Sequence, residues 1–215
     1  MLISFLVISI LIALDQWFKV HIKTTMQLHS EVNVLGKWFR LHFTENPGMA
    51  FGLELNFLGG YGKLGLTIFR IVAVVFGFYI LLNQAKKNAH VGFLICVSLI
   101  LAGAIGNLID SIFYGVIFND INSYIGGYFH GHVVDMLYFP IIEKENFTFF
   151  SPVFNLADTF ISTGAIAIFV FQRFLFAPSK ESEGGVLEEN IEAEIVEDIP
   201  KNEDNKDFSS PNEPQ

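Results

Sequence analysis

The stretch VGFLICVSLILAGAIGNLI, residues 91–109, contains no charged side chain and is followed directly by Asp110. A helix of about 20 apolar residues is long enough to cross the roughly 30 Å hydrocarbon layer of a bilayer. The sequence therefore predicts a transmembrane helix over residues 91–109 that ends at an acidic residue.

Three other stretches are apolar over a similar length, at residues 2–22, 64–82 and 153–171. The first has no Lys or Arg before it and no small-residue cleavage site after it, so we interpret it as a retained anchor rather than a cleaved signal peptide. The chain is 52% hydrophobic and 16% charged, with a mean hydropathy of +0.47, whereas soluble domains are about one quarter charged. The predicted fold class is therefore a membrane α-helical protein with four transmembrane helices.

Basic residues predict the orientation of these helices. Lys86 and Lys87 lie between the second and third stretches, and Arg173 follows the fourth. Loops rich in Lys and Arg are usually cytoplasmic. Both termini are then expected in the cytoplasm, and the two long connections, 23–63 and 110–152, are expected on the outer face.

The outer connections carry signals for a small extracytoplasmic β-rich part. Residues 38–43 alternate between apolar and polar side chains, as a half-buried strand does. The turn signal Asn46-Pro47-Gly48 follows, and residues 49–55 come after it. The second connection contains Gly126-Gly127 and many aromatic residues, which is typical of a further strand or of a segment at the membrane surface.

The net charge of −9 is concentrated at the C-terminus. Residues 181–215 contain 12 acidic and 2 basic side chains, whereas residues 1–180 contain 10 acidic and 11 basic ones. The C-terminal segment has too few large apolar residues to fold alone. We therefore predict a membrane domain over residues 1–178 and a disordered acidic cytoplasmic tail over 179–215. A nucleic-acid partner is not expected, and the single cysteine, Cys96, excludes an intramolecular disulfide.

Four aspartates are predicted to meet at the outer membrane face: Asp15, Asp110, Asp135 and Asp158. Because a charged residue at the centre of a membrane helix costs about 2.5–3.5 kcal/mol, acids in or beside such helices usually have a function. The alternative is that each acid only pairs locally, as Asp15 could with Lys19 at i and i+4. Convergence of all four on one side favours a site.

The phrase Asn-Leu-x-Asp occurs twice, at Asn107–Asp110 and at Asn155–Asp158. Each copy places an amide and a carboxyl on one helical face. Two carboxyls close together in a dry site share a proton, so one can activate water while the other protonates a leaving nitrogen. Serine chemistry has weaker support because the chain lacks Gly-x-Ser-x-Gly, and Cys96 has no base near it in the sequence.

Five short blocks occur in order between about residues 10 and 170. They are Asp15-Gln16 with Lys19, Asn46-Pro47-Gly48-Met49-Ala50-Phe51-Gly52, Gly106-Asn107-Leu108-Ile109-Asp110, Val133-Val134-Asp135, and Phe154-Asn155-Leu156-Ala157-Asp158. In these blocks the chain resembles the lipoprotein signal peptidases, the bacterial signal peptidase II family of membrane aspartyl proteases.

The resemblance implies a role for each polar residue of the blocks. Asp135 and Asp158 are expected to be the catalytic dyad. The family's polar positions around the dyad fall on Asn46, Asn107, Asp110 and Asn155. Asp15 and Lys19 are expected to be structural, and neither a metal nor a cofactor is implied.

The resemblance also implies a substrate and a location. The expected activity is an aspartyl endopeptidase that removes the signal peptide from diacylglyceryl-modified prolipoproteins, just before the lipidated cysteine. The expected location is the bacterial cytoplasmic (inner) membrane, as a monomer among membrane lipids with its active site at the outer face. Such a substrate is itself a membrane helix with acyl chains, so a membrane-embedded protease suits it.

The chain departs from the family pattern at three places. The family often has Arg after the Asn-x-x-Asp block, where this chain has Ser111, and Arg70 in the second predicted span is a candidate source of that positive charge. The segment 118–131 is longer than the corresponding segment in compact members of the family. The acidic tail is an addition to the family pattern.

Two other functional classes place polar residues in membrane proteins. A proton- or ion-coupled transporter usually holds carboxylates near the bilayer midplane and often has inverted repeats. A metal-dependent membrane hydrolase could use His130 and His132 with Asp135. No two of the six histidines are spaced at i and i+4 on a predicted helix, as the two histidines of a zinc hydrolase commonly are.

Overall fold

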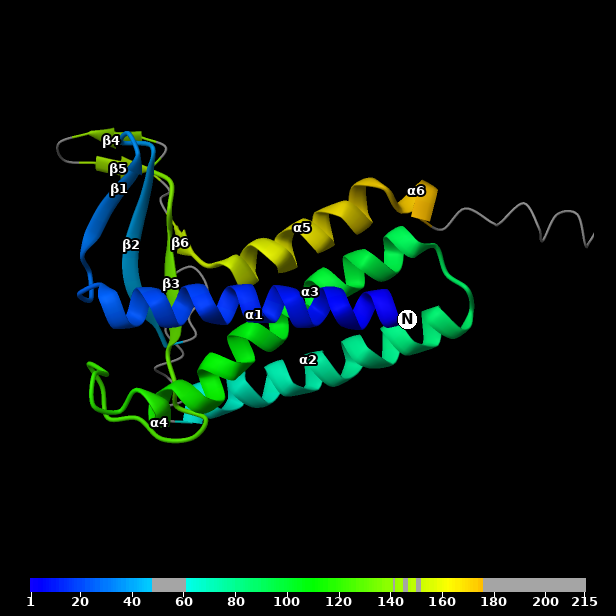
Figure 1. The fold of residues 1–215 in the computed structure, drawn as a ribbon, viewed down its shortest axis with the longest axis horizontal. Helices are drawn as coiled ribbons and strands as arrows, with labels where there is room; N and C mark the ends of the chain where they lie inside the picture. The colour runs from blue at the N-terminus through cyan, green and yellow to red at the C-terminus, as the bar shows by residue number, and fades with distance from the viewer. Residues whose placement is uncertain (48–60, 141, 145–146, 150–151, 176–215) are drawn as a thin grey trace, which may run out of the picture. The chain divides into compact units, whose positions relative to one another are not determined.

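In Figure 1 the long helices extend from one side of a small sheet. The computed structural model describes residues 1–47, 61–140, 142–144, 147–149 and 152–175. Its main helices are α1 (Leu2–Thr25), α2 (Tyr61–Lys86), α3 (Val91–Ile109) and α5 (Leu156–Val170). The predicted segments 49–55 and 179–215 lie outside the described residues.

Among the described residues, three helical stretches are long and apolar enough to cross a membrane, at Leu2–Thr25, Gly62–Lys86 and Val91–Ile117. The fourth predicted span is shorter, because α5 has 15 residues. Its predicted first residues, Val153–Phe154, instead form strand β6, and Asn155 caps the helix that follows. The described part of the chain therefore contains three long apolar helices and one shorter apolar helix.

Helix α3 is central to the helical part and packs against α1, α2 and α5. Glycines permit the closest approaches. A Cβ at Gly103 would collide with the backbone oxygen of Ala157 in α5, and a Cβ at Gly106 would lie 2.5 Å from Asp15 Oδ2 in α1. The outward faces carry exposed apolar side chains such as Phe69 and Phe169, which suits lipid better than water.

Helix α3 does not stop at its predicted end. A π-helical turn, η2 (Asp110–Tyr114), and a short helix α4 (Gly115–Ile117) continue it. Single π-helical turns are rare and frequently occur at functional sites. This turn begins at Asp110, whose side chain is fully buried.

The sheet has the antiparallel order β1-β2-β3-β6. Its strands are β1 (Glu31–Leu35), β2 (Phe39–Asn46), β3 (Val133–Tyr138) and β6 (Val153–Phe154). A separate hairpin pairs β4 (Ile142–Lys144) with β5 (Phe147–Phe149). The β-rich part predicted from residues 38–43 is confirmed, and both long connections contribute strands to it.

The helices have one end beside the sheet and the other end away from it. In Figure 1 the N-terminus and the α2–α3 connection lie at the end of the helices away from the sheet, and α5 starts beside β6. A last short helix, α6 (Gln172–Leu175), follows α5. The ring of Phe174 in α6 packs edge-on against His90 before α3, with centroids 4.8 Å apart. The end of the chain's described part therefore meets the α2–α3 connection.

Candidate active site

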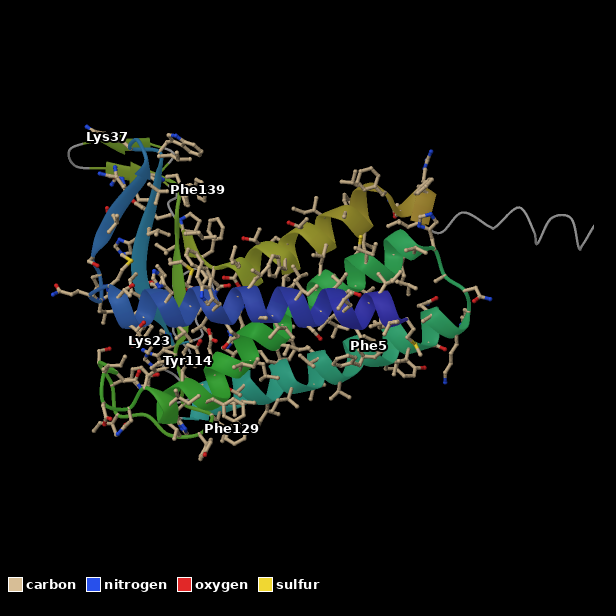
Figure 2. The ribbon with its side chains drawn as sticks, in the orientation of Figure 1. Phe5, Lys23, Lys37, Tyr114, Phe129 and Phe139 are labelled. Carbon is tan, nitrogen blue, oxygen red and sulfur yellow. The ribbon has the colours of Figure 1, made fainter. Side chains whose placement is uncertain are left out.

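Polar side chains from α1, α3, α5, β2 and β3 meet where the sheet joins the helices. Figure 2 shows Tyr114 and Lys23 in this junction, whereas Phe5 lies near the opposite end of the helices. The residues predicted to form the site are all brought together here. They are Asn46, Asn107, Asp110, Asp135, Asn155 and Asp158, with Asp15 and Lys19 beside them.

Asp135 lies on β3 and is 3% exposed. Two amide groups donate to its carboxyl: Asn46 Nδ2 to Oδ2 at 3.1 Å, and Asn155 Nδ2 to Oδ1 at 2.6 Å. Burial, and then the negative charge of Asp158, raise the pKa of Asp135 to about 7, although these hydrogen bonds oppose the rise. Asp135 can therefore hold a proton at nearly neutral pH.

Asp158 is half-buried in the first turn of α5. It forms a capping box with Asn155, in which the Asp158 N–H donates to Asn155 Oδ1 at 2.9 Å and the Asn155 N–H donates to Asp158 Oδ2 at 3.3 Å. Asn107 Nδ2 donates to the other carboxyl oxygen, Oδ1, at 2.8 Å. The positive end of the helix dipole and these donors stabilise a negative charge at this position.

Asn155 connects the two carboxyls directly. Its side chain donates to Asp135, accepts from the backbone of Asp158, and also donates to Asn107 Oδ1 at 3.2 Å. Asn155 is fully buried, so these contacts are made away from water. The two aspartates therefore have different environments around one shared amide.

Lys19 is the centre of a buried polar network next to Asp135 and Asp158. Its ammonium lies 3.0 Å from Asp15 Oδ2 and 2.9 Å from Asp110 Oδ2, and it donates to Asn107 Oδ1 at 2.8 Å. Lys19 and Asp110 are 0% exposed and Asp15 is 1% exposed. An unpaired charge would be very unfavourable here, so the three groups depend on one another.

This network holds the backbone immediately before Asp158 and Asp135. The N–H of Ala157 donates to Asp15 Oδ1 at 3.0 Å, and Ala157 precedes Asp158. The N–H of Val134 donates to Asp110 Oδ2 at 3.3 Å, and Val134 precedes Asp135. Asp15 and Asp110 therefore fix the start of α5 and strand β3 at the site.

Gln16 and Tyr114 complete the network, although no role was predicted for either residue. Gln16 Nε2 donates to Asp110 Oδ1 at 2.9 Å and to Asp15 Oδ2 at 3.2 Å. The Tyr114 hydroxyl donates to Gln16 Oε1 at 3.1 Å. The sequence signal that could have identified Gln16 is its position next to Asp15 within a long, mainly apolar stretch.

The end of α1 is joined to the strand that carries Asn46. Lys23 pairs with Glu45 of β2, and both side chains are buried. Ser123 Oγ also donates to Glu45 Oε2, at 3.2 Å, from the loop before β3. These contacts place Asn46 next to Asp135.

The histidines of the metal alternative face other partners. The ring of His132 stacks on Tyr124 with centroids 3.6 Å apart, and Nδ1 of His130 lies 2.9 Å from the backbone oxygen of Tyr128. Burial, and then the charges of two nearby lysines, lower the pKa of His132 to about 3, so this ring is neutral. Within the described ranges, no three His, Cys, Asp or Glu side chains are grouped so that they could hold a metal.

Comparisons with known proteins agree on one family. The family model described as signal peptidase (SPase) II matches residues 7–174. A lipoprotein signal peptidase of Porphyromonas gingivalis is 49% identical over 185 residues, covering 76% of this chain and 79% of the relative. A lipoprotein signal peptidase of Amoebophilus asiaticus is 38% identical and covers 75% of this chain and 74% of the relative.

The fold is also similar to a solved structure. A bacterial membrane enzyme solved by the in meso method superposes with a TM-score of 0.56 at 23% identity, covering 82% of this chain and 92% of the solved one. This likeness shows that the arrangement of helices and sheet is one already seen in a membrane enzyme.

Proposed function

Because this chain belongs to the signal peptidase II family of aspartic peptidases, which cleave signal peptides from prolipoproteins, we propose that Asp135 and Asp158 are its catalytic dyad. The membership confirms the family that the five sequence blocks predicted. The observation that carries the assignment is the shared amide of Asn155, which contacts both residues in a buried site. Membership also favours a peptidase over the transporter and the metal-dependent hydrolase.

Asp158 is the general base in this proposal. Its carboxylate is less buried than that of Asp135 and is stabilised by Asn107 and the start of α5. It accepts a proton from a water molecule as the water oxygen attacks the carbonyl carbon of the scissile amide. The attack produces a tetrahedral intermediate with a negatively charged oxygen.

Asp135 is the general acid. Its raised pKa lets it hold a proton at nearly neutral pH. It donates this proton to the amide nitrogen as the C–N bond breaks, which releases an amine and a carboxylic acid. Asp158 then holds the proton taken from water, and exchange with solvent restores the starting state.

We propose diacylglyceryl-modified prolipoproteins as the substrates. Support comes from the position of the dyad at one end of apolar helices, whose outward faces suit lipid. The acyl chains of such a substrate can remain in the lipid while the peptide bond beside the modified cysteine reaches the carboxyls. If the signal-peptide helix of the substrate crosses the membrane beside the enzyme, its scissile bond lies at the same end of the helices as the two carboxyls.

We propose that the site faces the outside of the bacterial inner membrane and that both termini are cytoplasmic. The contact between His90 and Phe174 supports this orientation, because it brings the basic segments at Lys86, Lys87 and Arg173 to one level. Asp158 is in the first turn of α5 and Asp135 is on β3, and both the start of α5 and strand β3 lie at the other end of the helices (Figure 1). The acidic tail, residues 179–215, would then be cytoplasmic and separate from the chemistry.

The purified protein in lipid vesicles should cleave a diacylglyceryl-modified precursor and leave the same precursor without the modification largely uncut. Mass spectrometry of the products gives the cleaved bond, which we expect just before the modified cysteine. The rate should be unchanged by a strong chelator. Loss of turnover with chelator and recovery with added zinc would contradict a mechanism based on two carboxyls.

The pH dependence follows from the raised pKa of Asp135. The acid must be protonated to donate, so kcat/KM should fall as the pH rises through about 7. The folded protein also binds this proton more tightly than the unfolded chain, so the free energy of unfolding should decrease between about pH 4 and 7. A pH–rate profile in lipid measures the first effect, and a flat profile up to pH 9 would be inconsistent with Asp135 as the acid.

A further inference from the structure

Arg70 is a charged residue within the apolar helix α2. The sequence around it, Ile68-Phe69-Arg70-Ile71-Val72, is otherwise apolar, and Phe69 and Val72 are exposed on the outward face. Ionisable residues inside membrane helices are unfavourable and usually face a functional interior. Arg70 itself is partly buried, in contrast to its two neighbours.

The guanidinium of Arg70 connects to the dyad through two residues of the α3 segment. Arg70 Nη1 donates to Ser111 Oγ at 2.6 Å, and Ser111 Oγ donates to the backbone oxygen of Asn107 at 2.9 Å. The Asn107 side chain in turn donates to Asp158 Oδ1 at 2.8 Å. Ser111 is 1% exposed, so this connection is buried.

The charge of Arg70 also acts on the site directly. Its guanidinium interacts electrostatically with Asp158 from α5, Asp110 from η2 and Asp135 from β3. Lys63, seven residues earlier on α2, is the like charge that interacts with it. Three carboxyls from three elements are therefore close enough to interact electrostatically with this cation.

The site needs a second positive charge once one member of the dyad is ionised. Lys19 is shared between Asp15 and Asp110, so its single charge already faces two carboxylates. An ionised Asp158 adds a further negative charge a short distance away. Arg70 approaches from α2, on a different helix from Lys19, and can balance this charge.

We propose that Arg70 is a positioning residue for the reaction. Its guanidinium, held by a hydrogen bond to Ser111, stabilises the ionised carboxylate of Asp158. The inference rests on the proposed function of Asp135 and Asp158. This role explains why an arginine lies in an otherwise apolar helix and why its guanidinium donates to the buried hydroxyl of Ser111.

The test is the pH profile of kcat/KM for cleavage of the diacylglyceryl-modified precursor in lipid vesicles. Arg70→Gln keeps a hydrogen-bond donor but removes the positive charge. The carboxyl of Asp158 should therefore ionise less readily. We expect the acidic limb of the profile to move up by about one pH unit, with a loss of about tenfold in rate on that limb. Arg70→Lys should retain the position of the limb, since it keeps the charge. Lys86→Gln, an exposed cation on the same helix, should match the unchanged protein.

Ser111→Ala provides an independent variant, because it frees the guanidinium without removing its charge. We expect it to shift the acidic limb in the same direction by a smaller amount. If Arg70→Gln does not fold in the membrane, Ser111→Ala and Arg70→Lys decide the question. Uniform loss of rate without a shift in Arg70→Gln, or no shift in Ser111→Ala when Arg70→Gln is unfolded, would overturn the proposal.

The failure of this inference can be separated from failure of the proposed function. If Asp135→Asn and Asp158→Asn are inactive and Arg70→Gln has an unchanged profile, only the role of Arg70 is wrong. If either asparagine variant cleaves normally, the dyad itself is wrong, and with it the inference about Arg70.

Discussion

Replacing Asp135 or Asp158 by asparagine is expected to lower kcat by about 10³-fold or more. Asparagine keeps the shape of the side chain but can neither accept a proton from water nor hold one for the leaving nitrogen. Each carboxyl accepts hydrogen bonds on both oxygens, and asparagine keeps one of these two acceptors. One hydrogen bond at the substituted position is therefore retained and the other is lost, and we expect each variant to remain folded. Cleavage of the modified precursor in lipid vesicles measures the loss.

Asp120→Asn is the matched control, because Asp120 is an exposed acid in the loop after α4. It should cleave at the rate of the unchanged protein. Thermal unfolding in detergent should show that all three variants are folded. Near-normal turnover by either Asp135→Asn or Asp158→Asn would remove that residue from the dyad.

Replacing Lys19 by methionine is expected to destabilise the protein by about 3–5 kcal/mol, since it leaves buried charges without their partner. Asp15 and Asp110 would then face each other and their backbone donors without the ammonium between them. The backbone before Asp135 and Asp158 would lose its position, so activity should fall as well. Equilibrium unfolding in detergent measures the change in free energy.

Two further variants show whether the effect arises from charge. Lys37→Met removes an exposed lysine and should leave stability within about 0.5 kcal/mol of the original value. Combining Lys19→Met with Asp15→Asn should recover part of the lost stability, because one uncompensated charge is removed. A Lys19→Met protein as stable as the Lys37→Met protein would show that the buried network contributes little.

The helices were largely predictable from the sequence because hydropathy reports burial in lipid. The start of α3 at Val91 was predicted correctly, whereas α2 begins at Tyr61 rather than at residue 64. The fourth span was predicted too long because Val153 and Phe154 are apolar in a strand as they are in a helix. Only pairing of this strand with β3 distinguishes the two possibilities, and pairing is a tertiary contact.

The candidate site was predictable as a set of residues but not as a network. Resemblance to a family predicted Asp135 and Asp158 as the dyad with amides around them, and the structure brings these residues together. The contact of the Ala157 N–H with Asp15 joins residues 142 positions apart, which no local pattern indicates. The hydrogen bond from Arg70 to Ser111 likewise joins two helical segments whose facing sides depend on packing.

If the two carboxyls act as one unit, a variant that lacks both should be no slower than a variant that lacks one. The measurement is kcat for the modified precursor with Asp135→Asn, with Asp158→Asn, and with both changes together. When two residues act as one catalytic unit, removing the second costs little after the first is lost. We predict that the double variant and each single variant have the same residual rate within about threefold. Losses that multiply in the double variant, or a single variant with nearly full activity, would contradict the claim.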